Sequence, residues 1–93
     1  MVISLPKRKL DSILKLLSVL LNEDKPVTPY YLQRKYDMRF DTLDRAIRVL
    51  LEVGFVNQEV EMGPPPRRFI SLTEKGRKAA YHAREILKLA GEL

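Results

Sequence analysis

Five arginines in two stretches of this 93-residue chain are the residues best suited to chemistry. Arg39, Arg45 and Arg48 lie close together, and Arg67 and Arg68 directly follow three consecutive prolines. A guanidinium presents a fork of N–H donors that matches phosphate oxygens and the major-groove edge of guanine. These residues therefore favour contact with nucleic acid, provided that the fold brings the two stretches to one surface.

The composition agrees with an anionic partner. The chain has 17 Lys and Arg against 12 Asp and Glu, which gives a net charge of +5. A small basic protein usually meets nucleic acid first and an anionic membrane surface second. The excess charge is spread along the chain and not concentrated in a tail, so binding must depend on folded geometry.

Several kinds of chemistry are excluded by missing residues. Without cysteine there are no disulfides, thiolate nucleophiles or zinc–thiolate sites, and the single histidine argues against a histidine metal site within one chain. The four glycines are too scattered to form a phosphate loop. We therefore expect no enzyme activity, no cofactor and no metal. The longest apolar run, 13–21, is shorter than the ~20 residues that span a bilayer, so we expect a cytoplasmic protein with no membrane partner.

The apolar pattern predicts one domain, 1–93, that begins with three helices. The first, 7–22, carries an apolar arc of roughly 220°, about twice what one core requires, so part of it should face a second partner. The second, 29–36, starts at Thr28 as N-cap. After a turn over 37–40, Asp41 should cap a third helix over 42–53, which Gly54 ends.

The second half of the chain predicts a hairpin over 55–72 and a last helix over 74–91, capped by Thr73. A short helix, a tight turn and a longer amphipathic helix form a helix-turn-helix, and a hairpin directly after it forms a wing. The expected fold is therefore α+β, a winged helix with a C-terminal dimerisation helix. In this fold the third helix is the recognition helix, which enters the major groove, while the wing follows the backbone or the minor groove.

Three stretches, 41–56, 67–70 and Ser71-Leu72-Thr73-Glu74-Lys75-Gly76-Arg77, carry a resemblance. They resemble the winged-helix transcriptional regulators of bacteria and archaea, nearest to the MarR/SlyA type, and a small regulator of an archaeon or an archaeal virus would suit the composition. The resemblance implies a sequence-specific regulator that binds double-stranded DNA as a homodimer. The chain departs from the family in its short, proline-stiffened wing and in lacking an extra C-terminal helix. No residue set marks a small-molecule effector site.

The candidate DNA-binding residues come from the second helix, the turn, the recognition helix and the wing. They are Thr28, Tyr30, Lys35, Arg39, Thr42, Arg45, Arg48, Arg67 and Arg68. The alternative for the recognition helix is a solvated face of ion pairs, Asp41–Arg45, Asp44–Arg48 and Arg48–Glu52. The alternative for the wing arginines is protection of a strand edge. Asp41 and Asp44 would repel phosphate, so we expect them to cap the helix or to accept from a cytosine amino group.

The first and last helices carry the dimerisation prediction. The candidate interface residues are Leu16, Val19, Leu20, Ala83, Ile86, Leu87, Ala90 and Leu93. The alternative is that the core of one chain absorbs these side chains. We also expect His82 at the surface or interface, and one of Tyr30 and Tyr31 in the core. Two other functions stay open: a sequence-tolerant architectural chromatin protein, and a winged helix that serves as a protein-interaction module.

Overall fold

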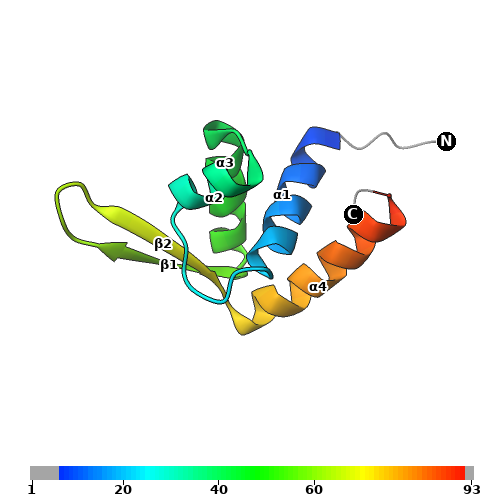
Figure 1. Ribbon diagram of the computed structural model, residues 1–93. Helices are drawn as coiled ribbons and strands as arrows, with labels where there is room; N and C mark the ends of the chain where they lie inside the picture. Colours follow the sequence, from blue (N-terminus) through cyan, green and yellow to red (C-terminus); the bar gives the residue numbers. More distant parts are fainter. Residues whose placement is uncertain (1–6, 92–93) are drawn as a thin grey trace.

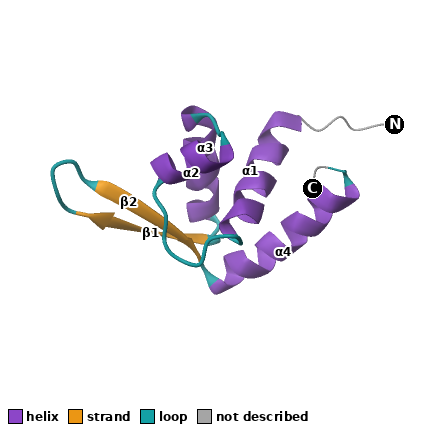
Figure 2. Ribbon diagram, viewed as in Figure 1, coloured by secondary structure: helices purple, strands orange, loops and turns teal. Residues whose placement is uncertain are grey.

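The structure, a computed structural model, describes the backbone of residues 7–91 and the side chains from residue 12 to residue 91. Three helices, a hairpin and a fourth helix follow one another, as the sequence predicts (Figures 1 and 2). The elements are α1 (Lys7–Leu20), α2 (Pro29–Tyr36), α3 (Phe40–Glu52), β1 (Val56–Glu61), β2 (Arg67–Leu72) and α4 (Glu74–Leu89). This arrangement is a winged helix. The hairpin extends away from the helices, and its tip stands clear of them (Figure 1).

The first helix lies in the middle of the molecule. It packs against α3 on one side and α4 on the other, and Figure 1 shows it between these two helices. Five consecutive residues, 16–20, are buried. The wide apolar arc is thus explained within a single chain, because α1 needs two partners and both belong to its own fold.

This burial corrects part of the predicted dimer interface. The side chains of Leu16, Val19, Leu20, Ala83 and Leu87 belong to the core of the single chain and are at most 8% exposed. The expectation that they face a second copy is therefore wrong. Of the remaining candidates, Ile86 and Ala90 are exposed, and Leu93 lies outside the described residues.

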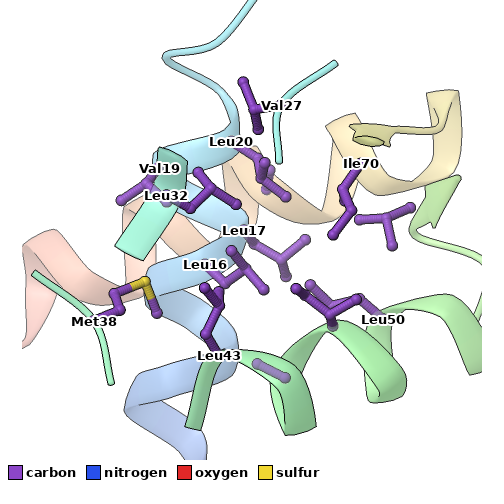
Figure 3. Close-up of a cluster of buried hydrophobic side chains, with 14 of the residues drawn as sticks. Leu16, Leu17, Val19, Leu20, Val27, Leu32, Met38, Leu43, Leu50 and Ile70 are labelled. Carbon is purple, nitrogen blue, oxygen red and sulfur yellow. The ribbon is translucent and has the colours of Figure 1, made fainter. Parts of the chain in front are cut away.

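One hydrophobic core joins α1, α3 and the hairpin. Side chains of α1 converge with Leu43 and Leu50 of α3 and with Ile70 of the hairpin, as Figure 3 shows. The recognition helix supplies its side of this core through residues three and four apart, which is the spacing that places side chains on one helix face. Its buried residues are Leu43, Ala46, Ile47 and Leu50.

The turn between α2 and α3 is shorter than the sequence predicts. Asp37 adopts the left-handed conformation with φ of 52°, and its N–H donates to the carbonyl of Gln33. Because this residue turns the chain sharply and Met38 is buried, the third helix already begins at Phe40. The expected start at residue 42 is therefore wrong, and so is Asp41 as N-cap. Arg39 occupies the cap position without a side-chain cap, and Asp41 lies in the first turn.

The wing is anchored by a contact that the sequence pattern does not reveal. The two strands are antiparallel, with Val56 opposite Leu72 and Glu61 opposite Arg67. Val27, which lies between the first two helices, forms a one-residue bridge to Ile70. The Val27 N–H donates to the Ile70 carbonyl at 2.9 Å, and the Ile70 N–H donates to the Val27 carbonyl at 2.8 Å. The hairpin is thus fixed to the segment between α1 and α2.

The junction between the wing and α4 caps two helices at once. Thr73 Oγ1 donates to the Gly54 carbonyl at 2.7 Å and accepts from the Gly76 N–H at 2.9 Å, which confirms Thr73 as the N-cap. Lys75 Nζ donates to the Val53 carbonyl at 2.9 Å. These bonds satisfy carbonyls at the end of α3, where Gly54 adopts φ of 78° as predicted. The Thr-Glu-Lys-Gly stretch therefore fixes α4 to the end of the recognition helix.

Helices α1 and α4 each end two residues earlier than expected.

Candidate nucleic-acid interface

The arginines on the exposed face of α3 differ in whether a carboxylate pairs with them. Arg45 is exposed and has no hydrogen-bond or ion-pair partner among the described side chains. Arg39 is 84% exposed, and its Nε lies 3.7 Å from Asp41 Oδ1. This pair replaces the expected Asp41–Arg45 pair. Thr42 is half-buried beside them. Arg45 therefore presents all of its donors to an incoming ligand.

Asp44 joins the recognition helix to the wing. Its Oδ2 lies 3.1 Å from Arg48 Nη2, which is the predicted pair one turn apart. Its Oδ1 lies 3.3 Å from Arg68 Nη2 on β2. The expected Arg48–Glu52 pair is absent from the described ion pairs, since Arg48 points to Asp44. Asp44 is therefore not the helix cap, and each of its oxygens already contacts one arginine.

The two wing arginines face opposite sides of the hairpin. Consecutive strand residues alternate between the faces, and directly opposed residues share one face. Arg68 lies opposite Val60 and contacts α3 through Asp44. Arg67 lies opposite Glu61, pairs with its carboxylate at 3.3 Å and stacks 5.9 Å from the Phe69 ring centre. Arg68 therefore borders the recognition helix, whereas Arg67 stands on the other face.

The start of α2 combines a capped helix with exposed aromatic side chains. Thr28 Oγ1 accepts from the Tyr31 N–H at 3.1 Å, which confirms Thr28 as N-cap. Tyr30 and Tyr31 are 64% and 39% exposed, so the expectation that one of them is in the core is wrong. Pro29 and Leu32 take the core-facing positions of this short helix. The hydroxyl of Tyr30 accepts from Arg34 Nη1 at 2.9 Å.

A carboxylate near the start of the α1–α2 connection forms an ion pair with Lys35. Glu23 is only 10% exposed, and its Oε1 lies 2.9 Å from Lys35 Nζ and 2.8 Å from the Tyr36 hydroxyl. Tyr31 also donates to this carboxylate, at 3.2 Å. The ammonium of Lys35 lowers the pKa of Glu23, and the Tyr31 hydroxyl and Glu23 raise the pKa of Lys35. Burial raises the pKa of Tyr36.

This cluster distinguishes Lys35 from Arg45. Its ammonium already has a charged partner, whereas Arg45 has none among the described side chains. A phosphate contact by Lys35 would have to compete with Glu23. His82 is exposed on α4, as expected.

Among the side chains that the structure describes, 12–91, His, Asp and Glu form no group that could hold a metal ion. No helix in the described part of the chain is long and apolar enough to cross a membrane.

Comparison with solved structures agrees with the winged-helix assignment. No family model matches the sequence, and no curated protein is similar to it at a significant level. A transcriptional regulator homologue from Pyrococcus horikoshii OT3 superposes with a TM-score of 0.68 at 26% identity, over 84% of this chain and 77% of that one. A MarR transcriptional regulator from Methanosarcina mazei Go1 superposes with a TM-score of 0.71 at 24% identity, over 87% of this chain and 58% of that one. SSV1 F-93 superposes with a TM-score of 0.63 at 23% identity, over 97% and 98%.

Sequence reasoning missed the contact that organises this surface. The pairing of Asp44 with Arg68 joins residues 24 positions apart. Helical spacing indicates only the local partner, Arg48. Because successive residues of a strand point to opposite faces, the sequence does predict that Arg67 and Arg68 lie on different faces of the hairpin. This is the one signal in the sequence that distinguishes the two wing arginines.

Proposed function

We propose that the chain is a transcriptional regulator that binds double-stranded DNA in a sequence-specific manner as a homodimer. The observation that carries this proposal is the position of Arg45 on the exposed face of α3, where no described side chain pairs with it, with Arg68 of the wing bordering the same helix. Similarity of the fold to solved transcriptional regulators supports it.

In this proposal α3 lies in the major groove and the wing contacts the backbone or the minor groove. Arg45 reads a base edge, because a guanidinium can donate to two acceptors of guanine. Arg39, Thr42 and Arg48 lie on or beside the same face of the helix. Arg68 contacts a phosphate beside α3, and Arg67 contacts a phosphate from the opposite face of the hairpin. Tyr30 and the capped start of α2 bind a neighbouring phosphate.

The proposed dimer uses the exposed stripe of α4. Ile86 is 49% exposed and Leu89 is 86% exposed, and Ala90 lies beside them. At helical spacing these residues form one stripe next to the buried face of α4. A second copy can cover that stripe while α1 stays in the core. A two-fold dimer then places two recognition helices on a pseudo-palindromic site, with half-sites about one helical turn apart.

Selection from a randomised duplex library tests the sequence-specific part. We expect enrichment of a pseudo-palindrome, and binding that weakens steeply as salt increases because phosphate contacts release counterions. Equal binding to the enriched site and to random duplex at every salt concentration would instead favour an architectural protein. Absence of binding to any duplex at low salt would favour a protein-interaction module and contradict the proposal.

A further inference from the structure

We propose that Asp44 restrains the DNA-contacting arginines and so lowers the affinity for arbitrary DNA relative to the correct site. The inference rests on the proposed function and deepens it. In the free protein the carboxylate holds Arg48 on α3 and Arg68 on the wing. DNA must exchange this carboxylate for phosphate before both arginines can contact the duplex.

The geometry suits such an exchange. Each oxygen of Asp44 serves one guanidinium, at 3.1 Å for Arg48 and 3.3 Å for Arg68. The Asp44 side chain is 20% exposed, whereas the Arg48 side chain is 76% exposed. The carboxylate therefore stays fixed against the protein, while the Arg48 guanidinium is free to turn toward solvent. Arg68 is 35% exposed and holds the wing beside the helix.

The electrostatics explain why this arrangement favours selectivity. A carboxylate on a DNA-binding surface repels the phosphate backbone of every duplex equally. Charge-assisted hydrogen bonds from two arginines to phosphate can compensate only when phosphates reach both guanidiniums together. A closely fitted site satisfies that condition, whereas loosely bound DNA does not. Specificity then arises from a penalty against wrong partners as well as from contacts with the right one.

The wing gives Asp44 a second role as a positioning residue. Arg68 lies 24 positions after Asp44 in the sequence, so this ion pair is a tertiary link between α3 and β2. The pair fixes where Arg68 stands relative to the recognition helix. A phosphate that replaces Asp44 therefore meets both arginines already close together.

The test compares Asp44→Asn with Asp41→Asn on the full chain. Asp41 lies on the same helix, its side chain is 60% exposed, and among the described residues it pairs with Arg39, so its replacement makes the same charge change without touching the wing. Fluorescence anisotropy over a salt series measures affinity for a random duplex and for the site obtained by selection. We expect Asp44→Asn to raise random-duplex affinity about tenfold at low salt and to steepen the salt slope by roughly 0.9 for each additional phosphate that the protein neutralises. Affinity for the selected site should rise less.

The outcomes separate this inference from the proposed function. If the wild-type chain binds no duplex, the proposed function fails. If the wild-type chain binds but Asp41→Asn changes random-duplex affinity and salt slope as much as Asp44→Asn, only the inference fails. Loss of selected-site binding alone in Asp44→Asn would mean that Asp44 reads a base, which also overturns it. Asp44→Glu keeps the charge and reaches both guanidiniums, so it should restore the wild-type salt slope, and failure to do so counts against the inference.

Discussion

Gly76, in the first turn of α4, lies directly against the backbone carbonyl of Phe55. A methyl group built on Gly76 would overlap the Phe55 oxygen and carbonyl carbon. Both neighbours are backbone, so neither can move aside as a flexible side chain would. The contact belongs to the junction in which Thr73 and Lys75 bond the carbonyls that end α3. A glycine is therefore required here for close packing and not for a turn.

Gly76→Ala should destabilise the fold for this reason. Overpacking of a close contact typically costs about 1–3 kcal/mol, which exceeds the gain of up to about 1 kcal/mol from alanine in a helix. Gly63→Ala is the matched control, because nothing lies within 4 Å of its added methyl. Urea unfolding followed by circular dichroism measures both variants. Equal midpoints for the two would contradict the packing argument.

Arg45→Ala should weaken binding selectively. Loss of a guanidinium that reads a base edge costs about 1–3 kcal/mol at the selected site and relaxes preference at one position. Affinity for random duplex should fall much less. Lys78→Ala, which removes an exposed cation from α4, is the control and should leave the ratio of the two affinities unchanged. An equal loss on both duplexes would make Arg45 a backbone contact.

The wing arginines should differ from each other. Arg67→Ala with Arg68→Ala should weaken binding to all duplexes and reduce the salt slope by roughly 0.9 for each phosphate that is no longer neutralised. Of the two single variants, Arg68→Ala should have the larger effect, because Arg68 borders α3 while Arg67 faces the other side and pairs with Glu61. Anisotropy titrations at several salt concentrations measure this. A larger effect of Arg67→Ala would place the DNA on the outer face of the wing.

Ile86→Glu combined with Leu89→Glu should convert the proposed dimer into a monomer. Both side chains are exposed in the single chain, so the change should leave the fold intact. Val60→Glu is the control, since Val60 is 51% exposed, close to the 49% of Ile86, but lies on the wing. Sedimentation velocity gives the oligomeric state, and circular dichroism checks the helices. A wild-type monomer at all concentrations, or a variant that stays dimeric, would contradict the interface.

Glu23→Gln should remove a pH-dependent part of the stability. The Lys35 ammonium lowers the pKa of Glu23 below its ordinary value of 4.5. A carboxyl with a lowered folded-state pKa stabilises the fold fully above 4.5 and loses that contribution as pH falls through the folded-state value. Glu23→Gln weakens the hydrogen bonds that Lys35 and the tyrosines donate to this side chain, which should lower the free energy of unfolding by about 1–2 kcal/mol at pH 7. Thermal unfolding from pH 3 to pH 7 should show a smaller pH dependence in the variant than in the wild type.

Local pattern predicted the elements well because they depend on neighbouring residues. The bounds of α2, the end of the hairpin at residue 72 and both threonine caps agree with prediction. The start of α3 did not, because the left-handed conformation of Asp37 shortened the turn. Helical periodicity gave the width of the apolar arc on α1 but could not tell whether α4 or a second chain covers it. The Val27–Ile70 bridge has no local signal at all, since it consists of one residue on each side.

The candidate site likewise depends on contacts between residues far apart in the sequence. Sequence spacing proposed the arginines and the local partner of Arg48, but not which cations remain unpaired. Arg45 lacks its expected partner because Asp41 turns to Arg39. Lys35 has a partner because the α1–α2 connection folds back onto α2. Charge along a sequence indicates an anionic ligand, whereas the tertiary pairing decides which cations are available to it.

The bonded corner between α3 and α4 has a geometric consequence for the proposed dimer. Helix α4 has 16 residues, so it is a rod about 24 Å long, and its first turn is fixed to the end of the recognition helix. The two recognition helices are then held apart by rods and not by flexible linkers. The length of α4 would then set the spacing of the two half-sites, and adding or removing a residue between Gly76 and Ile86 would rotate the partner about the helix axis by about 100°.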